Sequence, residues 1–275
     1  MKIQAFIILL LFFCLTSCKT EKQQNGVDEK TAEMEETTSK GRETGLPLTE
    51  AMTKADSLVA DAIAAHGGEL YDTAYYGFRF RKKQYSFRNS PSGYRFSATE
   101  QKDGDNIEGI LENGNLTRIV NGDTTELSDK EVAKYTEALN SVIYFATLPH
   151  KLQDEAVNRD YVGQTTIAGQ KYETVAVTFD QEGGGEDYSD EFRYWINADT
   201  KTVDYLAYNY ETNDGGVRFR SAYNPRTVGG IRFQDYVNYE APIGTPLDEL
   251  PELFEAGKLK ELSRIETEKV VELKK

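Results

Sequence analysis

Two histidines, each at the end of an apolar stretch, are the side chains in this sequence best suited to acid–base chemistry. His66 is followed by Gly67 in "AAHGGEL", and His150 follows Pro149. A general base needs an orienting carboxylate and a nucleophile or substrate within reach, and the linear sequence shows no such set around either histidine. No H-x-x-x-H pair is present, so a zinc site built on two or three histidines is not predicted.

His66 also has a structural interpretation. It continues an apolar stripe four residues after Ala62, and Gly67 supplies the positive φ with which helices commonly end. A protonated imidazole in the last turn would suit the helix dipole. We therefore interpret "HGG" as the end of a helix, and catalysis by His66 stays open as the alternative.

An acidic loop, "EGGGEDYSDE" at residues 182–191, is the second group with chemical potential. Glu186, Asp187 and Asp190 are candidate Ca²⁺ ligands because oxygen-rich loops bind this ion. Their spacing differs from the D-x-[DN]-x-[DN]-G loop of EF-hands, and the glycines lack the helix and lysine of a phosphate loop. We favour a solvated hairpin loop, with calcium as the alternative, and predict no cofactor and no resident metal.

The first residues predict an export signal. An apolar run, "AFIILLLFFC", is too short to span a bilayer, and "LTSC" follows it at residues 15–18. This resembles the lipobox of bacterial lipoproteins, which implies that residues 1–17 are removed and that Cys18 carries the acyl chains of a membrane anchor. An ordinary secretory signal is the alternative. Cys14 leaves with the signal, so no thiol remains for catalysis, disulfides or thiolate metal sites.

Composition divides the mature chain into a tether and a domain. Residues 18–47 comprise the acylated cysteine and a polar, acidic segment that buries too little apolar surface to fold, so we predict a disordered tether reaching about 30 Å. Residues 48–275 are predicted to form one domain. The net charge of −14 argues against nucleic acid as a partner, because both are polyanionic.

Two amphipathic helices are predicted within the domain. One begins at Thr49 or Thr53 and ends at His66; the other begins at a capping box of Ser128 and Glu131 and ends before Pro149. The remaining sequence consists of strand patterns joined by turn signals such as Asn-Gly at 113–114 and 121–122, which favour tight hairpins. We therefore predict an α+β domain containing a long antiparallel meander.

Alternation along the strands predicts one apolar face. Residues 175, 177 and 179, 217 and 219, and 231 and 233 are apolar and share a parity, whereas Arg218 and Arg220 have the opposite one. The apolar face needs a cover, and the two helices are the candidates.

The order of lipobox, tether, helix ending in "AHGG" and strand meander resembles the LolA/LolB-like lipoprotein-carrier superfamily of Gram-negative envelopes. The resemblance implies an incomplete, half-barrel sheet with helices covering its apolar face around a cavity for acyl chains. Five segments resemble a family of uncharacterised envelope lipoproteins more closely: "SVIYFATLPHKL", "GGGEDYSDEFRYWIN", "DYLAYNY", "GGVRFRSAYNPR" and "GIRFQDYVNYE". This closer resemblance covers about residues 50–270.

The sequence and its resemblance together predict a non-catalytic lipoprotein, anchored in the outer membrane and facing the periplasm, with a monomer favoured. It would bind an acyl-chain, amphipathic or lipoprotein ligand. The cavity is expected to be lined by Phe179, Phe219 and Phe233, faced by Leu139 and Ile143. Two alternatives remain: a sensory or scaffold module that binds a partner envelope protein, and an envelope hydrolase with paired carboxylates in a cleft.

Overall fold

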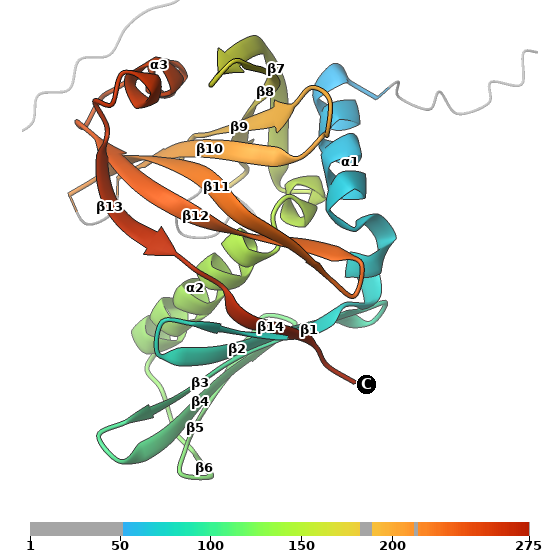
Figure 1. The fold of residues 1–275 in the computed structure, drawn as a ribbon. Helices are drawn as coiled ribbons and strands as arrows, with labels where there is room; N and C mark the ends of the chain where they lie inside the picture. Colours follow the sequence, from blue (N-terminus) through green and yellow to red (C-terminus); the bar gives the residue numbers. More distant parts are fainter. Residues whose placement is uncertain (1–51, 182–188, 212–213, 275) are drawn as a thin grey trace, which may run out of the picture. The chain divides into compact units, whose positions relative to one another are not determined.

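Fourteen strands form two seven-stranded antiparallel sheets (Figure 1), counted over residues 52–181, 189–211 and 214–274, which the computed structural model describes. The first sheet has the order β14-β1-β2-β3-β4-β5-β6, and the second has the order β13-β12-β11-β10-β9-β8-β7. Neither sheet closes on itself or on the other, so no closed barrel forms.

The strands of the first sheet are Tyr75–Phe80 (β1), Lys83–Ser90 (β2), Gly93–Lys102 (β3), Asp105–Glu112 (β4), Asn115–Val120 (β5), Asp123–Thr124 (β6) and Glu268–Glu272 (β14). Those of the second are Val157–Ile167 (β7), Gln170–Phe179 (β8), Phe192–Asn197 (β9), Val203–Tyr210 (β10), Gly216–Val228 (β11), Ile231–Ala241 (β12) and Lys260–Ile265 (β13).

Short turns explain why neighbouring strands are antiparallel. At both Asn-Gly pairs the two residues have positive φ: 47° and 83° at Asn113 and Gly114, and 54° and 97° at Asn121 and Gly122. These angles suit hairpin turns whose twist matches that of the flanking strands. The predicted hairpins at these positions are therefore confirmed.

The strand pattern of residues 261–273 is divided between the sheets. Its first part, β13, pairs with β12, and its second part, β14, pairs with β1. Where the chain passes from β13 to β14, the buried Asp235 carboxylate accepts hydrogen bonds from the Thr267 amide at 2.9 Å and from Arg226 Nη2 at 3.0 Å. One continuous segment thus forms an edge of each sheet (Figure 1).

The helices are α1 (Lys54–His66), α2 (Asp129–Ala146) and α3 (Leu250–Glu255), with 3-10 turns η1 (Gly68–Thr73), η2 (His150–Gln153) and η3 (Leu247–Glu249). Capping boxes start both long helices: Thr53 with Asp56, and Ser128 with Glu131. None of the helices within the described residues has the length and apolar character needed to cross a bilayer.

Three apolar clusters hold these elements together. α1 packs on the second sheet with Val175, Tyr194 and Ile196, whereas α2 contributes Leu139 and Ile143 to the cluster on the first sheet. The third cluster lies on the opposite face of the second sheet, where η3 and α3 pack over Trp195 and Phe219. The predicted α+β domain with antiparallel strands is confirmed, whereas the single meander of the prediction is divided into two sheets.

The predicted signal (1–17), Cys18 and the tether (18–47) lie outside the described residues. Residues Glu50–Lys275 form one compact unit.

Candidate functional site

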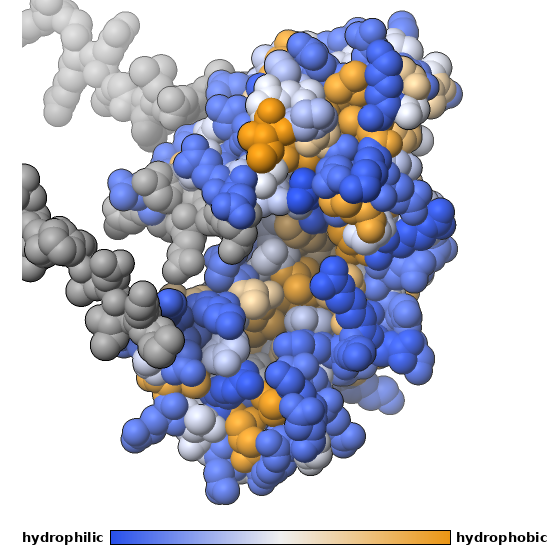
Figure 2. All heavy atoms as spheres, turned by 90° about the vertical axis from the view of Figure 1, so that its left-hand side faces the viewer, coloured by the Kyte–Doolittle hydropathy of each residue, from blue (hydrophilic) through white to orange (hydrophobic). Residues whose placement is uncertain are grey.

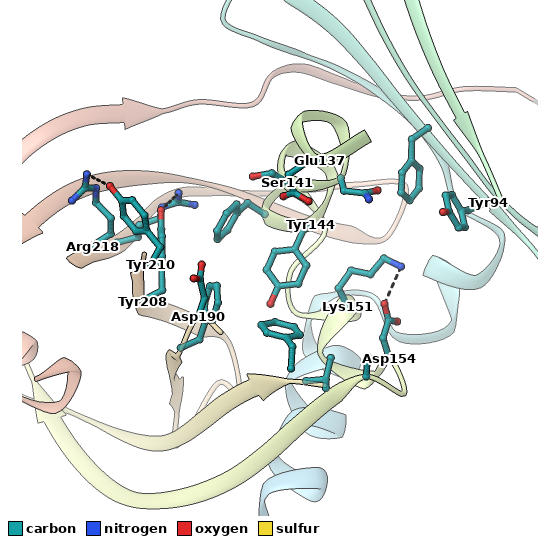
Figure 3. Close-up of a pocket in the computed structure, with 18 residues that line it drawn as sticks. Tyr94, Glu137, Ser141, Tyr144, Lys151, Asp154, Asp190, Tyr208, Tyr210 and Arg218 are labelled. Carbon is teal, nitrogen blue, oxygen red and sulfur yellow. Dashed lines mark hydrogen bonds and ion pairs between the residues drawn. The ribbon is translucent and has the colours of Figure 1, made fainter. Parts of the chain in front are cut away.

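A cavity of about 530 Å³ lies between α2 and the second sheet, close to strand β3. Its walls are the inward-facing residues of α2, the segment after η2, the ends of β8 to β11, and Tyr94 and Phe96 of β3. Figure 2 shows a hollow with hydrophobic side chains among hydrophilic ones on one face of the molecule. In Figure 3, Tyr144 projects from α2 into the middle of the cavity.

Aromatic rings make up most of the apolar lining: Tyr94, Phe96, Tyr144, Phe145, Phe179, Phe192, Tyr208 and Tyr210. Several of these rings pack on one another; the Phe192 centroid lies 5.6 Å from that of Phe179 and 5.2 Å from that of Tyr208. Such rings offer a large apolar surface with little rotational freedom, which suits a flexible apolar ligand.

Charged side chains lie among these rings. Lys151 Nζ pairs with Asp154 at 3.2 Å, and Arg218 donates a hydrogen bond to the Tyr210 hydroxyl (Figure 3). Glu137 and Asp190 also line the cavity. The Asp154 carboxylate, which also lines the cavity, forms its ion pair with Lys151.

Arg220 is the most deeply buried cation of the lining, with 7% of its surface exposed. Its Nη2 donates to the Tyr208 hydroxyl at 2.8 Å, and its Cζ lies 3.8 Å from the centroid of the Phe145 ring. The guanidinium is thus held between two aromatic residues, one from β10 and one from α2.

The hydroxyls of Tyr144 and Tyr194, 2.8 Å apart, tie α2 to the second sheet. Burial raises the pKa of both phenols, so both stay neutral at physiological pH. On the other side of α2 lies a second cavity of about 200 Å³. The two cavities share Ser141, Phe145 and Arg220 as lining residues.

Of the five residues expected to bind a ligand, Phe179 lines the larger cavity. Leu139, Ile143 and Phe233 lie in the packed core of the first sheet, where the Phe233 ring is 5.4 Å from that of Tyr76. None of these three is among the described residues that line either cavity.

The assignment of Phe219 to the cavity is corrected by the structure. Its ring packs on Trp195 at 5.6 Å and on Phe254 of α3 at 5.1 Å, on the face of the second sheet away from the cavity. Because successive residues of a strand point to opposite faces, Arg218 and Arg220 point into the cavity instead of outward. Alternation defined the two faces of β11, but not which of them α3 covers.

His66 ends α1 as predicted, and Gly67 follows with a φ of 136°. The imidazole is fully buried, and its Nε2 accepts a hydrogen bond from the Val203 amide at 3.2 Å. Burial, together with the charge of Arg232, lowers the pKa of His66 to about 3. The expected favourable contact of a protonated His66 with the helix dipole is therefore corrected: this imidazole is neutral.

His150 begins η2 and stacks on Tyr71, with 4.6 Å between ring centroids. Its Nδ1 lies 3.0 Å from Gln153 Nε2, and burial lowers its pKa. Neither histidine lines the larger cavity among the described residues.

Two of the three candidate calcium ligands, Glu186 and Asp187, lie outside the described residues. Asp190 is described; it is 6% exposed and lines the larger cavity. Within the described part of the chain, no cluster of three or more His, Cys, Asp or Glu side chains is arranged to hold a metal ion.

Sequence reasoning missed Arg220, Tyr208 and Phe145 as cavity residues. A usable signal was present, because four of the five motifs that resemble the envelope lipoproteins carry cavity residues: Phe145 lies in "SVIYFATLPHKL", Phe192 in "GGGEDYSDEFRYWIN", Tyr208 in "DYLAYNY" and Arg220 in "GGVRFRSAYNPR".

The chain belongs to the family of unknown function DUF6503, whose model matches residues 75–267. A search of curated proteins finds no match.

Among solved structures, the chain is similar to a LolA superfamily protein from Nitrosomonas europaea. The identity is 10%, the TM-score is 0.48, and the match covers 82% of this chain and 95% of that one. It is also similar to a DUF1329 family protein from Desulfovibrio piger (9% identity, TM-score 0.38, 79% and 92% covered). A third similar structure is lipoprotein LppX from Mycobacterium tuberculosis. The identity is 11%, the TM-score is 0.27, and the match covers 57% of this chain and 89% of that one. The resemblance to an uncharacterised family, stated from the motifs, is found again in the family model.

Proposed function

We propose that this protein is a non-catalytic envelope lipoprotein that buries the acyl chain of an amphipathic ligand in the cavity beneath α2. The observation that carries this function is the aromatic lining of a cavity of about 530 Å³. That volume lies within the range of about 300–1,000 Å³ found for small-molecule sites. A solid core with an exposed apolar patch would instead have favoured a module that binds a partner protein.

The energetics suit an acyl chain. Each buried methylene contributes about 0.8 kcal/mol, so a chain of about ten carbons gains roughly 8 kcal/mol before the entropic cost of association. Rings such as Phe179, Phe192 and Tyr208 supply this surface without demanding a fixed hydrogen-bond geometry. Selectivity for the chain therefore depends on shape and length more than on polar contacts.

Location follows from the N-terminal sequence. We place the acyl anchor at Cys18, the tether at residues 18–47, and the domain on the periplasmic side of the outer membrane. Replacing Cys18 by Ala should release the protein from membranes and prevent its labelling by a fatty acid. Continued labelling of this variant would contradict the lipobox assignment.

Binding is tested with the delipidated domain and N-phenyl-1-naphthylamine, a neutral probe that fluoresces in apolar surroundings. We expect saturable binding of about one probe per chain. Ser141→Trp places an indole in the cavity and should abolish binding, whereas Ala138→Trp, at an exposed position of the same helix, should leave it unchanged. Absence of binding to the unaltered domain would contradict the proposed function, and breakdown of a bound lipid would favour the hydrolase alternative.

A further inference from the structure

Arg220 carries a buried charge that forms no ion pair with any residue the structure describes. Its Nε and Nη1 are buried and have no hydrogen-bond partner among the described residues. Among the described residues, Nη2 alone has a hydrogen-bond partner, the Tyr208 hydroxyl.

This arrangement is costly for the empty protein. Arginine does not lose its proton in proteins, so burial cannot be relieved by neutralisation. An unpaired buried charge and unsatisfied donors both oppose folding. The same guanidinium is nevertheless held in place, with Phe145 against one face and Tyr208 at one nitrogen. The N–H groups of Nε and Nη1 therefore remain available, each in a fixed direction on its own edge of the guanidinium.

Position along the cavity distinguishes Arg220 from its neighbour Arg218. Arg218 is partly exposed and donates to Tyr210, whereas Arg220 is buried beneath α2, where the larger and smaller cavities share lining residues. Asn238, the cross-strand partner of Arg220, also has a buried side-chain oxygen without a partner and lines the smaller cavity. Unsatisfied polar atoms thus gather at the inner end, and aromatic rings line the path to it.

We propose that Arg220 binds the anionic head group of the ligand, which enters head-first, while its acyl chain lies against the aromatic rings of the larger cavity. This inference rests on the proposed function and specifies its ligand class: a single-chain amphiphile ending in a carboxylate or a phosphate. Oxygen acids fit because Nε or Nη1 can donate to one oxygen of a head group while the second N–H of Nη2 donates to another.

The test compares ligands that share a chain and differ in the head group. Decanoate, decyl phosphate and the neutral decanol are each used to displace N-phenyl-1-naphthylamine from the delipidated domain. The variants are Arg220→Gln, which removes the charge, and Arg264→Gln, which removes an exposed arginine that lines neither cavity. Thermal unfolding of each variant is measured alongside.

For the unaltered domain we expect an anionic ligand to bind about 10- to 100-fold more tightly than decanol, the range set by a hydrogen bond to a charged group. Arg220→Gln should remove that preference, leave decanol binding unchanged and keep or raise the unfolding midpoint, because a buried unpaired charge is lost. Arg264→Gln should behave as the unaltered domain. The stronger of decanoate and decyl phosphate identifies the head group.

Two results would overturn the inference. If the neutral probe binds but decanoate, decyl phosphate and decanol displace it equally, in both Arg220→Gln and the unaltered domain, Arg220 does not select a head group although the cavity still binds chains. If the neutral probe itself does not bind, the proposed function fails and the inference fails with it. A fall in the unfolding midpoint of Arg220→Gln without a change in ligand preference would show a structural role instead.

Discussion

The two long helices cover their sheets in different ways. In α1, six of 13 residues are buried, whereas in α2 only Leu139 and Ile143 of 18 residues are buried. α1 is packed tightly against the second sheet, but α2 spans a cavity on each of two sides. The difference separates a helix that is mostly packed in the core from one that lines cavities, although both have an amphipathic sequence.

If α1 is the stabilising helix, Gly67→Val should give the largest effect. Gly67 has a φ of 136°, and an added Cβ would lie 3.1 Å from Ile231 Cγ1. Strain and overpacking together should cost roughly 4 kcal/mol, or about 10 °C in the unfolding midpoint. Gly68→Ala is the control, since it also places a side chain at positive φ, 55°, but nothing lies within 4 Å of its added Cβ. Equal losses for both variants would show that the contact with Ile231 is unimportant.

Truncating one apolar side chain on each helix compares them directly. Leu58 of α1 is 7% exposed in a packed cluster, so Leu58→Ala should lower the free energy of unfolding by about 3 kcal/mol. Val142 of α2 borders the smaller cavity, and Val142→Ala should cost about 1 kcal/mol or less because little packing is lost. Urea denaturation measures both. A larger loss for Val142→Ala would contradict the distinction between the helices.

His66 makes the α1 side sensitive to acid. Its pKa is about 3 when folded and about 6.5 when unfolded, so the unfolded chain binds the extra proton between these values. Its stabilising contribution is complete above about pH 6.5 and is lost as the pH falls towards 3. By pH 5 the loss is about 2 kcal/mol.

The measurement is urea denaturation at pH 7.5 and pH 5. His66→Gln should be less sensitive to pH than the unaltered chain, because an amide does not titrate and its oxygen can still accept from the Val203 amide. Identical pH dependence in the two proteins would show that His66 is not the group responsible.

A smaller effect than that of His66 is expected at the contact between α2 and the second sheet. Tyr144→Phe removes the hydrogen bond to Tyr194 and leaves one buried hydroxyl unpaired, which should cost about 1–2 kcal/mol. Because this bond holds α2 over the cavity, the dissociation rate of the naphthylamine probe should also rise, as stopped-flow fluorescence would show. An unchanged rate would mean that α2 is positioned by its core contacts alone.

Local chemistry made part of this structure predictable. The capping box at Ser128, the Asn-Gly turns and the helix end at Gly67 depend on a few neighbouring residues, and each was identified from the sequence. For the start of α1 the sequence left Thr49 and Thr53 open, and the structure shows the cap at Thr53. The cavity depended on long-range packing. Alternation along β11 could not show that a helix of six residues, α3, covers Phe219, so Arg220 was assigned to the wrong side.

The state of His66 could not be predicted for a similar reason. Its place in the last turn of α1 was evident from spacing, but its neutrality follows from burial and from Arg232 on the distant β12. The division of residues 261–273 between two sheets was hidden because the strand pattern continues across the break at Thr267.

The crossing from β13 to β14 determines the order in which the domain can assemble. Tyr76 of β1 pairs with Glu272 of β14, nearly 200 residues later in the chain, whereas every other pairing of the first sheet is a hairpin. Closing so long a loop costs about 3 kcal/mol more in chain entropy than closing a four-residue turn. Hairpins therefore form early, and the edge of β1 stays open until β14 arrives. The rate-limiting step of folding should be the pairing of β14 with β1, and the hydrogen bond from the Thr267 amide to Asp235 should stabilise this pairing once it has formed.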